Sequence, residues 1–323
     1  DKAKQKFTPC PAGTKLTRVQ CPITEYERLE CAKFDYRGCV GSLLYLTRMT
    51  RPDLAYVIGE LCGFLDNPGT RHIDICKYVL RYLAATYDYG LSYVVTTDEE
   101  FPWFPYAYVD ASWNDGDVDS KPTGGFLVCS MGCVLAYSSK KLKFVPRSTA
   151  EAEFVQMSLL ARYLLYLRNL YLEFPIVRRG VYVVSAEVMA TFSLKIKKTI
   201  SKKYMDDCKE DEAKSGMPPW IVNEDNMGAI QMVYKTDIVN GRTSHIRRDQ
   251  NFIKFAVGNG DLEVTHCAGE HMFADPFTKA LSRDLFWKFN SRLVRSREAV
   301  KVSSYKYRLI PYTGLQEPEA SSE

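Results

Sequence analysis

The stretch from Phe104 to Glu153 constrains the fold of this chain more than any other part of the sequence. It opens with an aromatic and β-branched run over 104–113, which contains Asp110 and ends at a segment rich in turn-forming residues. Two further apolar runs, over 123–130 and 133–138, are separated by a short connection that contains a glycine. This pattern is typical of antiparallel hairpins, and it predicts three consecutive strands with Asp110 on or just after the first.

A long helix is predicted directly after these strands. Ser148 or Thr149, followed within three residues by Glu151, is typical of a helix N-terminus. The apolar run over 154–172 is long enough for a helix that is buried on most faces. Glu151 would then lie in the first turn, near the end of the sheet, where its carboxylate can approach that of Asp110.

Several short motifs follow one another along the chain. They are Tyr108-Val-Asp-Ala-Ser-Trp113, Gly124-Gly125-Phe126, Tyr137-Ser-Ser-Lys-Lys141, Ser148-Thr-Ala-Glu-Ala-Glu153, Asp225-Asn226 with Ala229-Ile230, and Phe273-Ala-Asp-Pro-Phe-Thr-Lys-Ala-Leu281. In this order they resemble the ribonuclease H region of Copia-type LTR retrotransposon polyproteins. Upstream, residues 36–56 and 71–83 resemble the segment that follows the polymerase palm in the same polyproteins. The resemblance covers roughly residues 34–285.

This resemblance implies an α/β fold, with a ribonuclease H-like mixed five-stranded sheet, flanking helices and a small helical module before it. We expect an extended arm over 1–33 and a helical connecting module over 34–98, resembling the post-palm region of reverse transcriptase. The ribonuclease H-like domain would occupy 99–294, and a basic and aromatic tail 295–323. Residues 272–294 are expected to form the closing helix of the domain, which carries Asp275. Relative to the family, the domain carries an insert at about 176–219 in which an apolar half precedes a charged half.

Four carboxylates stand within matching motifs and are the candidate catalytic residues and metal ligands: Asp110, Glu151, Asp225 and Asp275. The resemblance implies two Mg²⁺ ions, with Mn²⁺ as a substitute, and cleavage of the RNA in RNA–DNA hybrids by two-metal phosphodiester hydrolysis. Magnesium prefers oxygen ligands, and a pair of ions about 4 Å apart can serve both the attacking and the leaving oxygen. Crowded carboxylates raise one another's pKa when no cation is present, so such a cluster is poor structural material. His266, before Asp275, is a further catalytic candidate for proton transfer, and His271 shares its loop.

Simpler interpretations exist for each of these residues taken alone. Asp110 can be a turn residue at the end of a strand, and Glu151 a partner of the helix dipole. Asp225 can cap the helix that follows it, and Asp275 can be a solvated helix carboxylate. A loop histidine is more often simply solvated. A different function also competes: a domesticated, catalytically silent structural subunit of a larger assembly such as a ribonucleoprotein. The absence of a polymerase palm, the insert, and Ser244-His-Ile-Arg247 in place of the family's usual Lys-His-Ile-Asp favour it. The intact carboxylates favour the enzyme.

Composition adds a few limits to these expectations. With 323 residues, of which 46% are hydrophobic and 25% charged, the chain is large enough for two packed units. Its net charge of +4 is small, so any polyanion must be bound by local basic patches. The expected partners are an RNA–DNA hybrid or structured RNA, with protein partners at the insert and the tail. Ten cysteines without a CxxC pair and four histidines indicate neither a zinc site nor a disulfide framework, so we expect an intracellular protein, without a choice among nucleus, cytoplasm and mitochondrion. No apolar run approaches the ~20 residues of a membrane span. A chain that begins at Asp1 is expected to be a processed product, a fragment or an ordered part of something longer.

Overall fold

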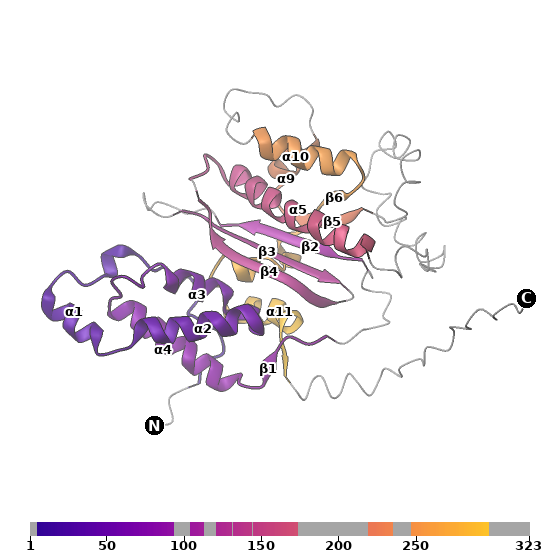
Figure 1. The fold of residues 1–323 in the computed structure, drawn as a ribbon. Coiled ribbons are helices and arrows are strands. Elements are labelled where there is room, and N and C mark those ends of the chain that lie inside the picture. The colour runs from indigo at the N-terminus through magenta and orange to yellow at the C-terminus, as the bar shows by residue number, and fades with distance from the viewer. Residues whose placement is uncertain are drawn as a thin grey trace, which may run out of the picture.

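The computed structural model describes residues 5–93, 104–112, 121–130, 132–143, 145–173, 219–234 and 247–296. The predicted insert, apart from its last residue, and the tail beyond residue 296 lie outside the described residues. A five-stranded mixed sheet in the order β4-β3-β2-β5-β6 lies between two layers of helices (Figure 1). This arrangement confirms the predicted α/β architecture of the ribonuclease H-like type. Among the described residues, no helix combines the length and the apolarity needed to span a membrane.

The sheet joins an antiparallel half to a parallel half. Its strands are β2 (Tyr106–Ala111), β3 (Thr123–Ser130), β4 (Cys133–Lys141), β5 (Trp220–Glu224) and β6 (Leu262–His266). Strands β2, β3 and β4 form the predicted antiparallel meander, while β5 pairs parallel with both β2 and β6. Because β2 and β5 are parallel neighbours, their carboxyl ends meet at the same edge of the sheet.

One face of the sheet is covered by three helices (Figure 1). They are α5 (Thr149–Glu173), α9 (Met227–Tyr234) and α10 (Arg247–Gly258). Alternate residues of β2, Ala107 and Val109, pack there with Phe154, Trp220 and Ile253 in one buried cluster. Helix α10 was not predicted from the sequence, and its buried residues recur at three- and four-residue spacing within a run of charged ones.

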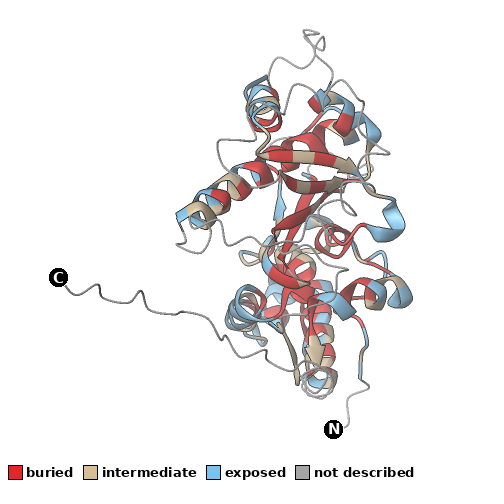
Figure 2. Cartoon of the chain, turned by 90° about the vertical axis from the view of Figure 1, so that its right-hand side faces the viewer, coloured by how far each residue is buried: buried red, intermediate tan, exposed pale blue. Residues whose placement is uncertain are grey.

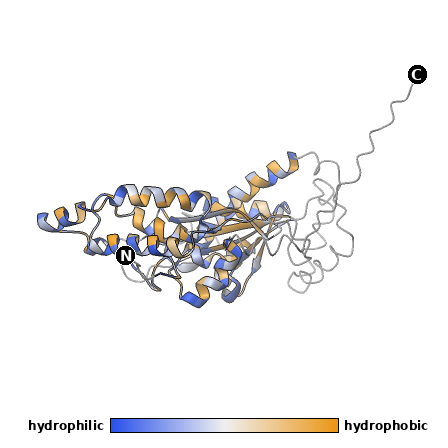
Figure 3. Ribbon diagram, turned by 90° about the horizontal axis from the view of Figure 1, so that it is seen from below, coloured by the Kyte–Doolittle hydropathy of each residue, from blue (hydrophilic) through white to orange (hydrophobic). Residues whose placement is uncertain are grey.

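The opposite face is covered by α11 (Arg283–Leu293) and by the helical module. The module consists of α2 (Tyr36–Met49), α3 (Ala55–Cys62) and α4 (Thr70–Ala85), with a short 3-10 turn at Pro52–Leu54. A 3-10 turn at Arg18–Gln20 and helix α1 (Glu25–Ala32) precede it. A helical module was expected over 34–98, and Figure 3 shows that its helices carry both hydrophobic and hydrophilic residues along their length. Tyr106 and Leu127 of the sheet belong to the same buried cluster as Leu54 and Ile58 of the module. The module and the sheet therefore share one core, and buried residues run through both parts in Figure 2.

Two further contacts join earlier parts of the chain to α11 and to the strand after it. Strand β1 (Tyr89–Gly90) pairs antiparallel with β7 (Arg295–Ser296), which directly follows α11. The indole nitrogen of Trp287 in α11 donates a hydrogen bond to the carbonyl oxygen of Phe7 at 2.8 Å. The first described residues thus pack on the last helix of the ribonuclease H-like part.

Two predicted segments differ from the structure. The segment before the module is not extended throughout, because Thr24 and Glu27 form a capping box that starts α1. The closing helix expected over 272–294 is divided into a 3-10 turn, Asp275–Phe277, and α11. Pro276 lies in the first positions of that turn, where its fixed φ and missing N–H are tolerated. Asp275 consequently lies in a turn against the sheet rather than on a long helix.

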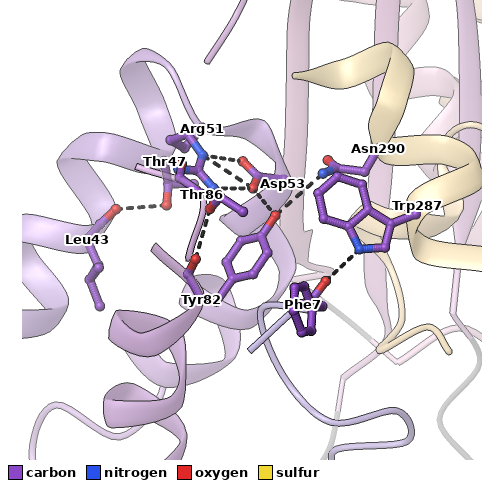
Figure 4. A network of polar contacts seen from close by, with 9 residues as sticks. All are labelled: Phe7, Leu43, Thr47, Arg51, Asp53, Tyr82, Thr86, Trp287 and Asn290. Atoms are coloured by element: carbon purple, nitrogen blue, oxygen red, sulfur yellow. Dashed lines mark hydrogen bonds and ion pairs between the residues drawn. The ribbon is translucent and has the colours of Figure 1, made fainter. Parts of the chain in front are cut away.

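A buried polar network connects the module to α11 (Figure 4). The guanidinium of Arg51 donates to both carboxylate oxygens of Asp53, at 3.0 and 2.8 Å, and to the carbonyl oxygen of Thr86 at 2.9 Å. The hydroxyl of Tyr82 donates to Asp53 at 2.7 Å and accepts from the side-chain amide of Asn290 in α11 at 3.4 Å. Arg51 and Asp53 are each 3% exposed, so the pair is desolvated and its partners are fixed.

Replacing Arg51 by Met is expected to lower the free energy of unfolding by about 3–5 kcal/mol, because the buried carboxylate of Asp53 loses its charged partner. Arg18→Met is the matched control. Arg18 pairs with Asp66 at 3.4 Å, but the two side chains are 69% and 63% exposed, so this change should cost at most about 1 kcal/mol. Urea unfolding followed by circular dichroism measures both, and equal losses in the two variants would contradict the importance of the buried network.

Candidate metal centre

Two carboxylates are brought to one edge of the sheet by the parallel pairing of β2 and β5. Asp110 is the fifth residue of β2, and Asp225 directly follows β5. The register pairs Tyr108 with Asn223, so each carboxylate lies two residues beyond this pair. Strand order and register therefore place the side chains of Asp110 and Asp225 near each other, although more than a hundred residues separate them in the sequence.

A third carboxylate, that of Glu153 in α5, completes the group. One oxygen from each of Asp110, Glu153 and Asp225 lies within 4.8 Å of the other two. Glu153 is 4% exposed, and its Oε2 has no hydrogen-bond partner among the described residues. A buried carboxylate oxygen without a partner is costly, whereas a hard divalent cation would satisfy it. The donor set of three carboxylates therefore fits Mg²⁺ or Mn²⁺.

The two glutamates near the N-terminus of α5, Glu151 and Glu153, have different surroundings. Residues two positions apart in a helix are related by a rotation of about 200° around its axis, so Glu151 and Glu153 lie on nearly opposite sides of α5. Glu151 accepts a hydrogen bond from the backbone N–H of Arg147 at 2.8 Å, and its own N–H donates to the hydroxyl of Ser148 at 3.2 Å. Glu151 thus caps the helix, and the structure brings Glu153 to the centre instead.

The choice between these glutamates could have been made from the sequence. Ser148 followed three residues later by Glu151 is the capping-box spacing, which assigns this glutamate to the helix end. That assignment leaves Glu153 as the acidic residue of the motif that can point elsewhere. The proposed ligand set therefore contains Glu153 in place of Glu151.

Asp275 lies next to the group of three but is not one of its members. The ammonium of Lys279 lies 2.9 Å from Asp275 Oδ1 and 3.6 Å from Asp110 Oδ2. The hydroxyl of Thr278 donates a hydrogen bond to the same oxygen of Asp110. The turn after the 3-10 segment thus brings a hydroxyl and a positive charge to one side of Asp110.

Gly125 allows that turn to approach the sheet. It lies opposite Asp110 in β3, and a Cβ atom added to it would be 2.7 Å from Phe277 Cβ and 2.8 Å from Thr278 Cγ2. A side chain of any size at this position would push the turn away from the strand. The absence of a side chain at Gly125 therefore sets the position of Thr278 and Lys279 relative to Asp110.

The two candidate histidines are exposed and lie outside the group of three carboxylates. His266 ends β6, paired with Glu224 in the strand register. His271 lies in a 3-10 turn, Gly269–His271, with its Nε2 3.5 Å from a carboxylate oxygen of Glu270. A role for either histidine in proton transfer stays a prediction.

Burial and mutual repulsion shift the pKa values at this centre. Burial, together with the charges of Asp110 and Asp225, raises the pKa of Glu153 to about 8. Burial and Asp110 raise the pKa of Asp275 to about 6, although Lys279 opposes the change, and they also raise that of Asp225. Divalent cations would remove this penalty, because each ion favours the ionised form of its ligands.

A further carboxyl group, that of Glu224, was not singled out from the sequence. It is completely buried at the end of β5, and its Oε1 accepts hydrogen bonds from the backbone N–H groups of Asp225 and Asn226, both at 3.1 Å. Burial and the nearby charge of Glu153 raise its pKa well above the usual value. Glu224 thus fixes the backbone from which Asp225 projects.

Similarity to known proteins agrees with this geometry. No protein-family profile matches the chain. It is 31% identical over 259 residues to the retrovirus-related Pol polyprotein from transposon RE1 of Arabidopsis thaliana, an alignment that covers 80% of this chain and 15% of the polyprotein. The corresponding polyprotein from transposon TNT 1-94 of Nicotiana tabacum is 28% identical over 285 residues, or 88% of this chain and 18% of that protein. The chain belongs to the Pol polyproteins of Copia-type retrotransposons.

This Copia Pol segment spans less than a fifth of the polyproteins named above. A shorter relative is the secreted RxLR effector protein 161 of Plasmopara viticola. It is 37% identical over 124 residues, which cover 38% of the Copia Pol segment and 84% of the effector. Sequence related to this segment therefore occurs both within long polyproteins and in a short protein.

Without added metal, the Copia Pol segment is expected to lose stability as the pH rises from about 5 to 8. The folded-state pKa of Glu153, about 8, lies above the ordinary value of 4.5, so the folded protein holds a proton that the unfolded chain releases. The resulting stabilisation is fully present below pH 4.5 and is lost as the pH passes through 8. Thermal unfolding in EDTA should show this slope, and Glu153→Gln should flatten it. An unchanged slope in that variant would contradict the assignment.

Gly125→Ala is expected to lower the free energy of unfolding by about 1–3 kcal/mol and to weaken Mn²⁺ binding, because the turn that carries Thr278 must move away from β3. Gly258→Ala is the control, since a Cβ atom added to Gly258 would have no neighbouring atom within 4 Å. Thermal unfolding with and without Mn²⁺ measures both effects. The expectation is contradicted if both variants respond to Mn²⁺ as the wild type does.

Proposed function

We propose that this Copia Pol segment cleaves the RNA strand of RNA–DNA hybrids by two-metal phosphodiester hydrolysis. The observation that carries the proposal is the group formed by Asp110, Glu153 and Asp225 at the carboxyl edge of a ribonuclease H-like sheet. These side chains come from β2, α5 and the end of β5, so the group exists only in the folded chain. Membership in the Pol polyproteins supports the same reaction.

Each residue near the centre has a defined part in this proposal. Asp110, Glu153 and Asp225 would hold one divalent ion, and Asp110 with Asp275 would hold the other. When bound, two Mg²⁺ ions, or Mn²⁺ in their place, supply activation of water, neutralisation of phosphate charge and stabilisation of the leaving oxygen. Thr278 orients Asp110 through its hydroxyl, and Glu224 orients Asp225 through the backbone.

Exposed basic residues at the same edge of the sheet support a nucleic-acid substrate. In the strand register Lys140 of β4 lies opposite Gly124 of β3, which pairs with Ala111, the residue after Asp110. Lys140 is exposed, as is Arg147 before α5. Local charges of this kind can contact phosphates even though the net charge of the chain is only +4. Recognition of the hybrid would then depend on its backbone shape and 2′-hydroxyl groups rather than on base sequence.

A catalytically silent structural subunit is the second candidate function. The similarity to effector protein 161 favours it, because the related sequence there makes up 84% of a short protein that is described as a secreted effector and not as a polyprotein. In that role the carboxylates would need no metal and the chain would bind its partners through other surfaces. The two candidates differ in one measurable property, the cleavage of a hybrid by the wild-type chain.

The paired variants Glu153→Gln and Glu151→Gln test the proposed reaction. We expect Glu153→Gln and Asp225→Asn to reduce the cleavage rate of a labelled RNA–DNA hybrid in Mg²⁺ by at least about a thousandfold, because each removes an anionic ligand. Glu151→Gln should stay within about tenfold of the wild type, because Gln can still accept the hydrogen bond from Arg147.

Three outcomes separate the alternatives. Loss of cleavage in Glu151→Gln but not in Glu153→Gln would restore Glu151 as the ligand. An inactive wild type would support the structural subunit. Cleavage that survives Asp225→Asn unchanged would contradict the proposed centre, since the chemistry would then lie elsewhere in the chain.

A further inference from the structure

We propose that Lys279 is a tethered cation that competes with the second divalent ion for Asp110 and Asp275. This inference rests on the proposed function and specifies how its metal centre is filled. The ammonium of Lys279 lies 2.9 Å from Asp275 Oδ1 and 3.6 Å from Asp110 Oδ2, so it occupies the space between the two carboxylates. These are the two residues left to bind a second ion once the group of three has bound the first.

The contacts of Lys279 are electrostatic. Asp275 Oδ1 is buried and has no aligned hydrogen bond among the described residues, although the ammonium is close enough to form an ion pair with it. An ammonium with a carboxylate on either side is stabilised in its charged form. The side chain is therefore a permanent positive charge at neutral pH, held by the same negative charges that attract a metal ion.

A divalent ion and this ammonium repel each other when they share ligands. Binding of a second ion to Asp110 and Asp275 therefore requires the ammonium to move away from both carboxylates. Lys279 has room to do so, because its side chain is 45% exposed and has a flexible stem that reaches solvent. Exchange between the lysine and the ion thus needs a change of side-chain rotamer and no unfolding.

The first ion meets a smaller obstacle, because Asp110 is the one member of the group of three that has an ion-pair contact with Lys279 among the described residues. Thr278 and Lys279 both contact Oδ2 of Asp110, so neither contact uses its Oδ1. The carboxylates of Glu153 and Asp225 complete the group of three, and no ion pair between Lys279 and either of them is found among the described residues. The two metal positions should consequently differ in affinity, because the lysine contacts both proposed ligands of the second ion and one of the three proposed ligands of the first.

Calorimetric titration of the full chain with Mn²⁺, without nucleic acid, tests this competition. We expect two classes of binding in the wild type, with the second at least about tenfold weaker than the first. Lys279→Met should tighten the second class by about tenfold or more and change the first by less than about threefold. Lys279→Arg keeps the positive charge and should leave the second class weak, while Asp275→Asn should abolish it.

Lys141→Met is the matched control for the loss of a half-exposed, paired lysine. Lys141 is 39% exposed and lies 3.2 Å from Glu60 of α3, in an ion pair outside the metal centre. This variant should bind Mn²⁺ as the wild type does. If the wild type binds a single ion, Lys279→Met should gain a second class, and failure to do so overturns the proposal. An unchanged or weaker second class in Lys279→Met overturns it as well.

The result for Lys279 can be separated from the result for the proposed function. A tighter second class in Lys279→Met, together with an inactive wild type, would support the competition and contradict hybrid cleavage. Cleavage by the wild type with no effect of Lys279→Met on Mn²⁺ binding would support hybrid cleavage and contradict the competition. Absence of Mn²⁺ binding in both proteins would overturn both. Urea unfolding of each variant shows whether a loss of binding reflects a loss of the fold.

Discussion

Repulsion among carboxylates at the ends of β2 and β5 is the interaction on which the arrangement of this molecule depends. Asp110, Glu153 and Asp225 converge from three separate elements, and burial strengthens their mutual repulsion. The surrounding contacts oppose that repulsion by fixing where each side chain can go. The hydroxyl of Thr278 donates a hydrogen bond to Asp110, and the buried carboxyl group of Glu224 accepts one from the backbone N–H of Asp225.

The helical module contributes to the centre although it supplies none of these carboxylates. The turn that carries Asp275 and Lys279 packs between the sheet and the module, and Phe277 belongs to the core that they share. Lys279 also lines a small cavity together with Asp53 and Tyr56 of the module. Because Asp53 is fixed by Arg51, the buried network of the module lies next to the turn that carries Lys279 and helps to support the candidate metal centre. Module and sheet should therefore be regarded as one structural unit.

Much of this fold could be predicted from sequence, since short-range patterns determine it. Aromatic and apolar runs bounded by turn-forming residues indicated β2, β3 and β4, and the register of the parallel strands in the structure brings Asp110 near Asp225. The sequence interpretation named Glu151 as the ligand, whereas the structure brings Glu153 to the group of three. The capping-box spacing from Ser148 to Glu151 was the sequence signal for this difference. The placement of Asp275 in a turn depends on tertiary contact with Gly125, and the ion pair of Lys279 with Asp110 joins segments that are far apart in sequence. Such contacts leave no local pattern.

The charge at the centre favours an enzyme over a structural subunit. A purely structural role would be served better by neutral side chains, because the buried carboxylate of Glu153 has a raised pKa and an oxygen that finds no partner in the part of the chain that the structure describes. Lys279 offsets part of the negative charge of Asp110 and Asp275. If all four carboxylates are ionised, one divalent ion together with Lys279 leaves one negative charge uncompensated, whereas two divalent ions without the lysine neutralise the set. Replacement of Lys279 by a second ion would therefore neutralise the four carboxylates once both ions are bound.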